Sequence, residues 1–395
     1  MTNYKIVSCF GVMNHNNIQT GIMSKNILGM IFFLFLLSGC DKGNNTVTHP
    51  ITCESDHSMD IITTRSFKMG FSTWNFGPDE ADRIATYQFI TSNADIYSEQ
   101  IEYKIPWKAW INNSSLPTAF TDDIAYRVSK KPLNHQLLLS VSLLNLDRSN
   151  LLEDYDGTIP TYTSMNDPAI ENAYYNHLVY LITQFSPNYL VIAMEANELK
   201  VKSEIKWTAY KLLMSNIRKR LKISYPNLPL SESVTLHNWY NPTVVNPADY
   251  IAEISNYVNQ NLDFAAISFY PFLKNLHNKT EFQQAFDFLH AQTKIPIAFV
   301  ETAHLAENLE ISNYNLNIKS DVCEQKDYLE TLLLNASTHH YKFIIWWSHR
   351  DFDKLWETFP AQSQDIAKLF RNTGLIDKDG TERPSYLVWK SILKK

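Results

Sequence analysis

Two apolar runs that each end in glutamate constrain the fold of this chain most strongly. Residues 189–195 read YLVIAME and residues 296–301 read PIAFVE, so each run is apolar up to its last position. Such runs indicate strands buried on both faces, as in a parallel sheet. Glu195 and Glu301 would then stand at the rim of the sheet, where the strands end. Either glutamate taken alone could simply start a loop or cap a helix. The presence of two such runs favours a position of both glutamates at the rim of the sheet.

Strand-like and helix-like segments alternate through the rest of the chain. The other predicted strands are residues 69–74, 94–101, 136–144, 230–236, 264–269 and 343–347. The helices between them are predicted from proline and acidic residues at their starts and from apolar residues at helical spacing. This alternation predicts an α/β fold, a single (β/α)8 TIM barrel over residues 67–395. No linker or change of composition divides this body into two domains.

Residues 1–40 read as a leader with a lipoprotein signal peptide. An apolar run at residues 27–37 follows Lys25 and is too short to span a membrane as a stable helix. The run ends in LSGC at positions 37–40, which resembles the bacterial lipobox. We therefore expect cleavage before Cys40 and lipidation of that cysteine. Because the run lies deep in the chain for a signal peptide, Met23 is the expected start of translation.

The leader predicts an exported and membrane-anchored protein. We expect lipidated Cys40 to hold the body on a bacterial membrane, on its periplasmic or cell-surface side; an uncleaved leader would also tether it. Residues 41–66 are mostly polar and predict a short flexible spacer. Cys53 and Cys323 are the cysteines of the mature body. Export permits a disulfide between them, which would pin the spacer to the barrel, but two free thiols fit the sequence equally well.

Charge and motif content exclude several classes of function. The 35 basic and 41 acidic residues give no surface for a polyanion, so nucleic acid is not an expected partner. The sequence has no GxGxxG or GxxxxGK[ST] motif for nucleotides, and no HExxH or CxxC motif for metals. We expect no cofactor and no metal, and a monomer.

Four short motifs resemble a known group of enzymes. They are IAME at residues 192–195, DFAAISFYP at 263–271, FVET at 299–302, and a closing segment from GLID at 374–377 through PSY at 384–386 to Trp389. In order and spacing they resemble the clan A retaining glycoside hydrolases, and most closely the arabinogalactan endo-beta-1,4-galactanase group. The resemblance covers residues 68–393.

The resemblance implies a reaction and a role for each glutamate. Glu195 would be the acid/base and Glu301 the nucleophile in the double-displacement hydrolysis of an O-glycosidic bond, and Tyr270 would touch the nucleophile. The substrate would be a polysaccharide or an oligosaccharide. This chemistry needs one protonated and one ionised carboxyl group, and two carboxylates held close together raise the pKa of one of them.

One departure from the family pattern leaves alternatives open. The clan usually has asparagine before the acid/base glutamate, where it bonds the sugar 2-hydroxyl, and this chain has Met194. Either Glu195 acts without that contact, or Asn197 and Glu198 supply the pair three residues later. We favour Glu195, since Glu198 would lie beyond the strand. Met194 also favours a second kind of function, a catalytically silent barrel that binds glycans at the cell surface; both glutamates argue against it.

Other candidate substrate contacts lie at the predicted strand ends. His237 closes the fifth strand, although a lone histidine is often structural. Trp346 and Trp347 end the eighth strand and should point in opposite directions, so that one forms a floor under the sugar. Trp74 ends the first strand, and Trp107 and Trp239 lie in loops on the same rim; any of these could be ordinary packing. Arg350 and Asp351 would form a loop salt bridge or contact the substrate.

Overall fold

The structure, a computed structural model, describes residues 53–54 and 57–395. The predicted signal peptide, Met23, Cys40 and most of the spacer lie outside the described residues. Within the described part of the chain, no helix is long and apolar enough to cross a membrane.

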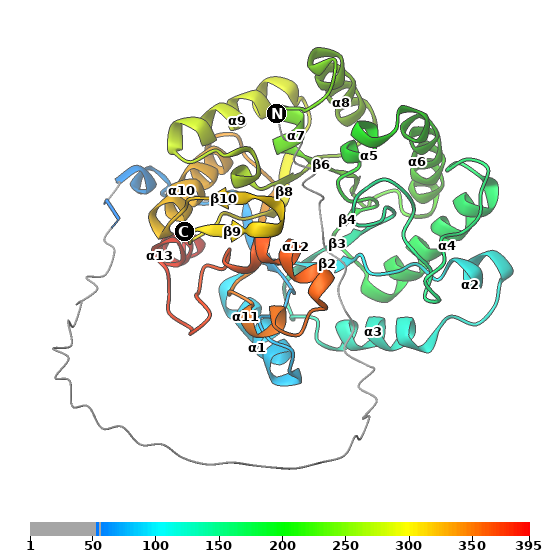
Figure 1. Ribbon diagram of the computed structural model, residues 1–395, viewed down its shortest axis with the longest axis horizontal. Coiled ribbons are helices and arrows are strands. Elements are labelled where there is room, and N and C mark those ends of the chain that lie inside the picture. Colours follow the sequence, from blue (N-terminus) through cyan, green and yellow to red (C-terminus); the bar gives the residue numbers. More distant parts are fainter. Residues whose placement is uncertain (1–52, 55–56) are drawn as a thin grey trace, which may run out of the picture.

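Nine parallel strand segments form a closed ring surrounded by helices (Figure 1). The segments are β1 (Lys68–Ser72), β2 (Ile96–Ile101), β3 (Gln136–Val141), β4 (Tyr189–Val191), β5 (Leu230–Ser231), β6 (Ser233–Thr235), β7 (Ala265–Phe269), β8 (Ile297–Thr302) and β11 (Phe343–Trp346). Glu232 alone separates β5 from β6, which are two halves of the predicted fifth strand. Because β4 pairs with β5, β6 with β7, and β11 with β1, the ring closes with eight strands. The predicted barrel is confirmed.

Helices follow the strands as the alternation predicts. They are α1 (Glu80–Asn93), α2 (Trp107–Asn112), α3 (Thr118–Ser129), α4 (Pro168–Phe185), α5 (Asn197–Lys202), α6 (Glu204–Ser224), α7 (Leu236–Tyr240), α8 (Pro247–Asn261), α9 (Lys279–Gln292), α10 (Val322–Thr338), α11 (Asp353–Trp356), α12 (Ala361–Arg371) and α13 (Pro384–Leu393), with short 3-10 helices η1 (His57–Ile61), η2 (Pro271–Lys274) and η3 (Ser312–Tyr314). In α4, for example, the Asp167 side chain accepts a hydrogen bond from the Ala169 amide at 2.8 Å, and Pro168 fills the first turn.

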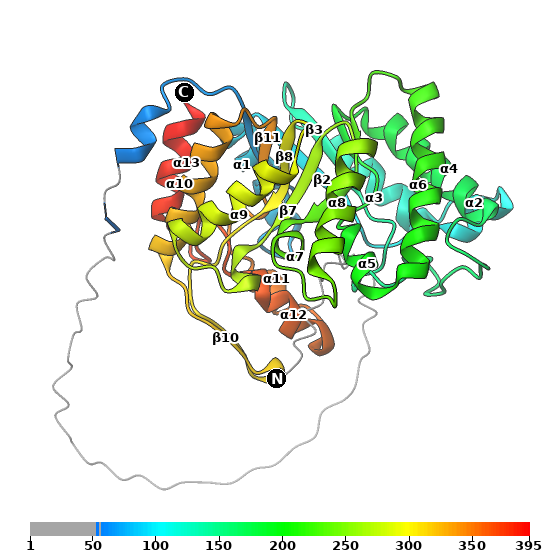
Figure 2. The ribbon, with the colours of Figure 1, turned by 90° about the horizontal axis from the view of Figure 1, so that it is seen from above.

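The end of the barrel where the strands finish carries extra structure. The chain after β8 forms a hairpin of β9 (Leu309–Ile311) and β10 (Leu316–Ile318), which the sequence patterns did not predict. The chain after β11 forms α11 and α12, and Figure 2 shows these helices at the same end of the barrel as β10. This is the end at which Glu195 and Glu301 lie.

The interior of the barrel is a separate apolar cluster of small and large side chains. Its members are Ile96, Leu138, Val191, Met194, Phe264, Ala266, Ala298, Val300, Phe343 and Ile345. Gly70 of β1 faces this layer closely: a Cβ atom there would collide with the carbonyl oxygen of Ile96 on β2. Only glycine permits this approach of the two strands.

The fourth strand is shorter than predicted. It ends at Val191, although Ile192 and Ala193 still exchange backbone hydrogen bonds with Ser231 and Ser233 of the next strand segments. Glu195 has a φ of 52°, in the left-handed region, and its amide bonds the Ser233 hydroxyl at 2.8 Å. A strand cannot continue through a left-handed residue, so the expectation of a strand through 195 is wrong. Because of this bend, the direction of the Glu195 side chain does not follow from the alternation of side chains along the strand.

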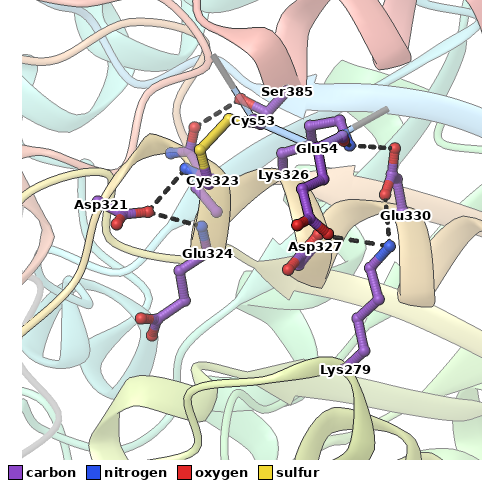
Figure 3. The surroundings of a disulfide bond; sticks show 11 residues. Cys53, Glu54, Lys279, Asp321, Cys323, Glu324, Lys326, Asp327, Glu330 and Ser385 are labelled. Carbon is purple, nitrogen blue, oxygen red and sulfur yellow. Dashed lines mark hydrogen bonds and ion pairs between the residues drawn. A yellow bond between two sulfur atoms is a disulfide. The ribbon is translucent and has the colours of Figure 1, made fainter. Parts of the chain in front are cut away.

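Cys53 and Cys323 form a disulfide, which decides between the two alternatives for these cysteines (Figure 3). The bond joins residues 270 positions apart and fastens the spacer to the first turn of α10. Met59 and Ile62, in the last part of the predicted spacer, are also buried. Residues 57–66, predicted as flexible spacer, therefore belong to the folded body.

We predict that Cys323→Ser lowers the free energy of unfolding by about 2–4 kcal/mol, because the cross-link restricts the unfolded chain over a long loop. Urea unfolding of the non-reduced proteins measures this difference. Wild type treated with dithiothreitol and Cys53→Ser should show the same loss, and no further loss should follow when either variant is reduced. A variant as stable as the oxidised wild type would contradict the prediction.

Candidate active site

Glu195 and Glu301 lie together at the C-terminal end of the barrel, and both are buried. Their exposed fractions are 4% and 5%. Glu301 belongs to β8, whereas Glu195 follows β4. The negative charge of Glu195 acts directly on the ionisation of Glu301, so barrel closure has brought the two carboxyl groups within electrostatic reach.

Two uncharged donors hold the Glu301 carboxyl group. Gln100 of β2 donates from Nε2 to one oxygen at 2.6 Å. Tyr270, which follows β7, donates its hydroxyl hydrogen to the other oxygen. The contact that the family resemblance implies for Tyr270 is therefore present. Gln100 was not predicted, although alternation along β2 points its side chain into the barrel.

An arginine holds the Glu195 carboxyl group. Nε and Nη2 of Arg148 donate to Oε2 of Glu195 at 3.1 and 3.0 Å, and the Ser268 hydroxyl donates to Oε1 at 2.9 Å. Arg148 lies in the loop between β3 and α4, where no sequence pattern marked it. Both partners have left-handed backbones, with φ of 57° at Arg148 and 52° at Glu195. Such conformations are costly for non-glycine residues and concentrate at functional sites.

The two glutamates differ in their affinity for protons. Burial alone would raise the pKa of Glu195, but the Arg148 charge and the hydrogen bonds outweigh burial and lower this pKa below its usual value. Burial, reinforced by the negative charge of Glu195, raises the pKa of Glu301 to about 7. The two buried carboxyl groups are therefore coupled, and their mutual repulsion disfavours ionisation of both at once.

The alternative pair, Asn197 and Glu198, makes contacts within the protein. The Asn197 amide group donates to the hydroxyl groups of Thr235 and Tyr250 at 3.0 and 2.9 Å, and its oxygen accepts from the Thr235 amide at 2.8 Å. Glu198 accepts hydrogen bonds from Asn238 at 2.6 Å and from the Thr235 hydroxyl. These bonds join the start of α5 to β6, α7 and α8. Both the nitrogen and the oxygen of the Asn197 side chain therefore bond groups of the protein, and neither is left for a sugar.

His237 lies beside Glu195. It is buried at the start of α7, and burial lowers its pKa to about 4 although the Glu195 charge acts in the opposite direction. Among the described residues, its Nδ1 atom has no hydrogen-bond partner. A neutral imidazole with an unused nitrogen at this position could bond a substrate hydroxyl.

Trp346, the last residue of β11, and Trp347, which follows it, point in different directions, as predicted. The Trp346 indole donates to the Thr373 carbonyl at 2.9 Å, and its ring lies 6.1 Å from Tyr328 of α10. Trp346 is therefore on the outer face of the strand, away from the two glutamates. The Trp347 ring lies 4.9 Å from Trp74, and both rings contact Phe352, which directly precedes α11.

Trp347 belongs to a row of aromatic rings that extends to Tyr270, which bonds Glu301. Phe370 of α12 lies 5.9 Å from Trp347 and 4.8 Å from Tyr270, the partner of Glu301. Trp347 is fully buried, and Trp74 has an exposed fraction of 8%. The segment that contains α11 and α12 therefore covers the ring faces that would serve as a sugar floor.

The remaining candidates have structural roles. The indoles of Trp107 and Trp239 donate to the carbonyl oxygens of Leu152 and Ile251. Arg350 and Asp351 do not form the expected loop salt bridge: Asp351 pairs with Arg383 at 2.7 Å, and Arg350 donates to the carbonyl oxygens of Asp377 and Lys378. In residues 53–54 and 57–395, no group of three or more His, Cys, Asp or Glu side chains could hold a metal ion.

Solved structures share this fold at low sequence identity. The catalytic domain of the GH53 protein of Ignisphaera aggregans has a TM-score of 0.55 and 14% identity, and the match covers 87% of this chain and 99% of that one. A GH5_18 protein of Bifidobacterium longum subsp. longum in complex with Manβ1-4GlcNAc has a TM-score of 0.61 and 13% identity over 83% of this chain and 78% of that one. An exo-beta-1,4-mannosidase from Opitutaceae bacterium strain TAV5 has a TM-score of 0.58 and 10% identity over 83% and 60%. No family model and no curated protein matches the chain.

Proposed function

We propose that this protein is a glycoside hydrolase that acts on a polysaccharide or an oligosaccharide. The observation that carries the proposal is the pair of buried carboxyl groups, Glu195 and Glu301, which lie within electrostatic reach of each other at the C-terminal end of the barrel and whose pKa values are shifted in opposite directions. Glycoside hydrolysis needs one protonated and one ionised carboxyl group. The shared fold supports the proposal, since the matched structures are of glycosidase families GH53 and GH5 and of a mannosidase.

The proposed mechanism is a retaining double displacement. Glu301 attacks the anomeric carbon, oriented by Tyr270 and Gln100, while Glu195 donates a proton to the leaving oxygen. Glu195 then removes a proton from the water that releases the sugar. The mechanism needs a proton on Glu195 when substrate is bound, whereas its ion pair with Arg148 favours the ionised form. The Arg148 ion pair with Glu195 must weaken at that step.

Hydrolysis of a glycan panel tests the proposed function. The purified protein should release reducing ends from at least one β-linked galactan, mannan or glucan, or 4-nitrophenol from the corresponding aryl glycosides. The anomeric form of the first product, followed by NMR, should match that of the substrate if the mechanism is retaining. Binding of a glycan without any product would instead support the glycan-binding barrel that Met194 favours.

We further propose that lipidated Cys40 anchors the protein to a bacterial membrane. The support is the LSGC motif after a short apolar run. Radiolabelled palmitate should enter wild type expressed in a bacterial host and should not enter Cys40→Ala. Cys53→Ser is the matched control, because it removes a cysteine from the same spacer and should keep the label. Equal labelling of wild type and Cys40→Ala would overturn this proposal.

A further inference from the structure

The Cys53–Cys323 disulfide lies at the end of the barrel that carries the candidate active site. Cys323 belongs to the first turn of α10, which begins shortly after β10 (Figure 3). In the same turn, Gln325 donates hydrogen bonds to the carbonyl oxygens of His304 and Gly374, each at 3.0 Å. His304 follows β8 and Gly374 follows β11, so this turn packs where the strands finish. The disulfide therefore fastens Cys53 at the catalytic end of the barrel.

The chain after Cys53 runs along α10 to the opposite end of the barrel. Lys326 of α10 donates from Nζ to the Glu54 carbonyl oxygen at 3.2 Å. Lys395, just after α13, donates to the Met59 carbonyl oxygen of η1 at 3.0 Å. Figure 2 shows η1, in blue, and the C-terminus at the end of the barrel opposite β10, α11 and α12. The first part of the body therefore spans the barrel from its catalytic end to the end where the strands begin.

The disulfide decides at which end the N-terminal segment joins the body. Among the described residues after Cys53, Met59 is the first that is buried. The bond from Lys326 to Glu54 is exposed, and a single exposed hydrogen bond contributes too little to hold the chain. Without the disulfide, the segment would therefore join the body at η1. The 17 residues of α10, about 25 Å of helix, separate the two ends.

The length of the N-terminal segment turns this difference into a distance from the membrane. Residues 41–52 lie between Cys40 and Cys53, and a chain of that length reaches at most about 45 Å. A chain from Cys40 to Met59 reaches about 65 Å, and its junction lies a further ~25 Å from the catalytic end. The disulfide therefore halves the largest possible distance between the candidate active site and an anchor at Cys40.

We propose that the Cys53–Cys323 disulfide holds the candidate active site within about 45 Å of the membrane that lipidated Cys40 would anchor. The membrane surface is then the partner of the catalytic end. Glycans carried on that surface are favoured over glycans in solution, because the tether raises their effective concentration at the site. The inference rests on the proposed lipid anchor and the proposed glycosidase function, and it adds the position of the active site relative to the bilayer.

Energy transfer to labelled lipids tests this position. A donor dye is attached to Asn317→Cys, on β10, or to Thr338→Cys, at the far end of α10; both positions are exposed. The full chain, expressed in a bacterial host, is inserted into phosphatidylglycerol–phosphatidylethanolamine vesicles that contain a rhodamine lipid. Transfer should be more efficient from position 317 than from position 338. In Cys53→Ser/Cys323→Ser, transfer from position 317 should fall, and the difference between the positions should vanish or reverse.

A lengthened tether is the matched control. Glycine and serine residues inserted between Asn45 and Thr46, as many as separate positions 53 and 59, lengthen the tether equally and keep the disulfide. Transfer should fall from both dyes but remain more efficient from position 317, because the segment still joins the body at the catalytic end. Loss of the difference in this control would overturn the role of the disulfide.

Hydrolysis of one glycan in two forms gives a second measurement. The oligosaccharide that wild type accepts is offered either coupled to a vesicle lipid or free in solution. Cys53→Ser/Cys323→Ser should lose at least about twofold in rate on the coupled form, since effective concentration falls roughly as the −3/2 power of tether length. Its kcat/KM on the free form should equal that of wild type, which shows that the variant is folded. Equal losses on both forms would overturn the inference.

The outcomes distinguish this inference from the proposals on which it rests. Failure of wild type to bind the vesicles would overturn the lipid anchor and this inference with it. Bound wild type with equal transfer from positions 317 and 338, or with transfer unchanged when both cysteines are replaced, would overturn the role of the disulfide alone. The expected transfer without hydrolysis of any glycan would overturn the glycosidase function and still support the position of the site.

Discussion

Glu301→Ala should reduce turnover of every glycoside substrate by at least about 10⁴-fold, because no covalent glycosyl-enzyme can form without the nucleophile. Glu195→Ala should be equally severe on ordinary glycosides but much milder in the first step with 2,4-dinitrophenyl glycosides, whose leaving group needs little protonation. Steady-state and pre-steady-state release of the phenol measures both effects.

Added azide distinguishes the roles of the two glutamates. Azide should restore part of the turnover of Glu195→Ala and yield the glycosyl azide with the configuration of the substrate, since a small anion attacks the intermediate without base assistance. Glu198→Gln, which preserves the shape of the buried side chain, should need no rescue. Rescue of Glu301→Ala with the substrate configuration, and none of Glu195→Ala, would reverse the assignment of the two roles.

Arg148→Met should lower the free energy of unfolding by about 3–5 kcal/mol at pH 7, because it leaves the Glu195 carboxylate buried without its partner. The lowered pKa of Glu195 contributes stability above the usual value of 4.5, and that contribution is lost as pH falls through the pKa of the folded state. The difference in melting temperature between wild type and Arg148→Met should therefore be largest near pH 7 and smaller near pH 4.

A double variant is the control for this prediction. Arg148→Met/Glu195→Gln removes both charges and should recover most of the lost stability, whereas Glu195→Gln alone leaves the guanidinium group unpaired. The coupling free energy from the four proteins measures the ion pair directly. If Arg148→Met is as stable as wild type at pH 7, or if the difference does not depend on pH, the ion pair does not hold Glu195 as described.

The sequence by itself determined the barrel and the two glutamates at its rim. These features are local: an apolar run buried on both faces predicts a strand whatever lies beside it, and its last residue lies at the sheet edge. The same locality explains the prediction that Trp346 and Trp347 diverge, since neighbours on a strand point to opposite faces. It also explains the position of Tyr270, which directly follows a predicted strand.

Only the tertiary structure decided which side chains meet these glutamates. Gln100 and Glu301 are 201 positions apart, and Cys53 and Cys323 are 270 apart, so no local pattern relates them. Arg148 lies in a loop, where side-chain direction depends on the whole fold. For the same reason, the predicted end of the fourth strand lies several residues after its observed end. Its apolar residues continue to Met194, but the strand ends at Val191, and the Glu195 amide bonds the Ser233 hydroxyl of β6.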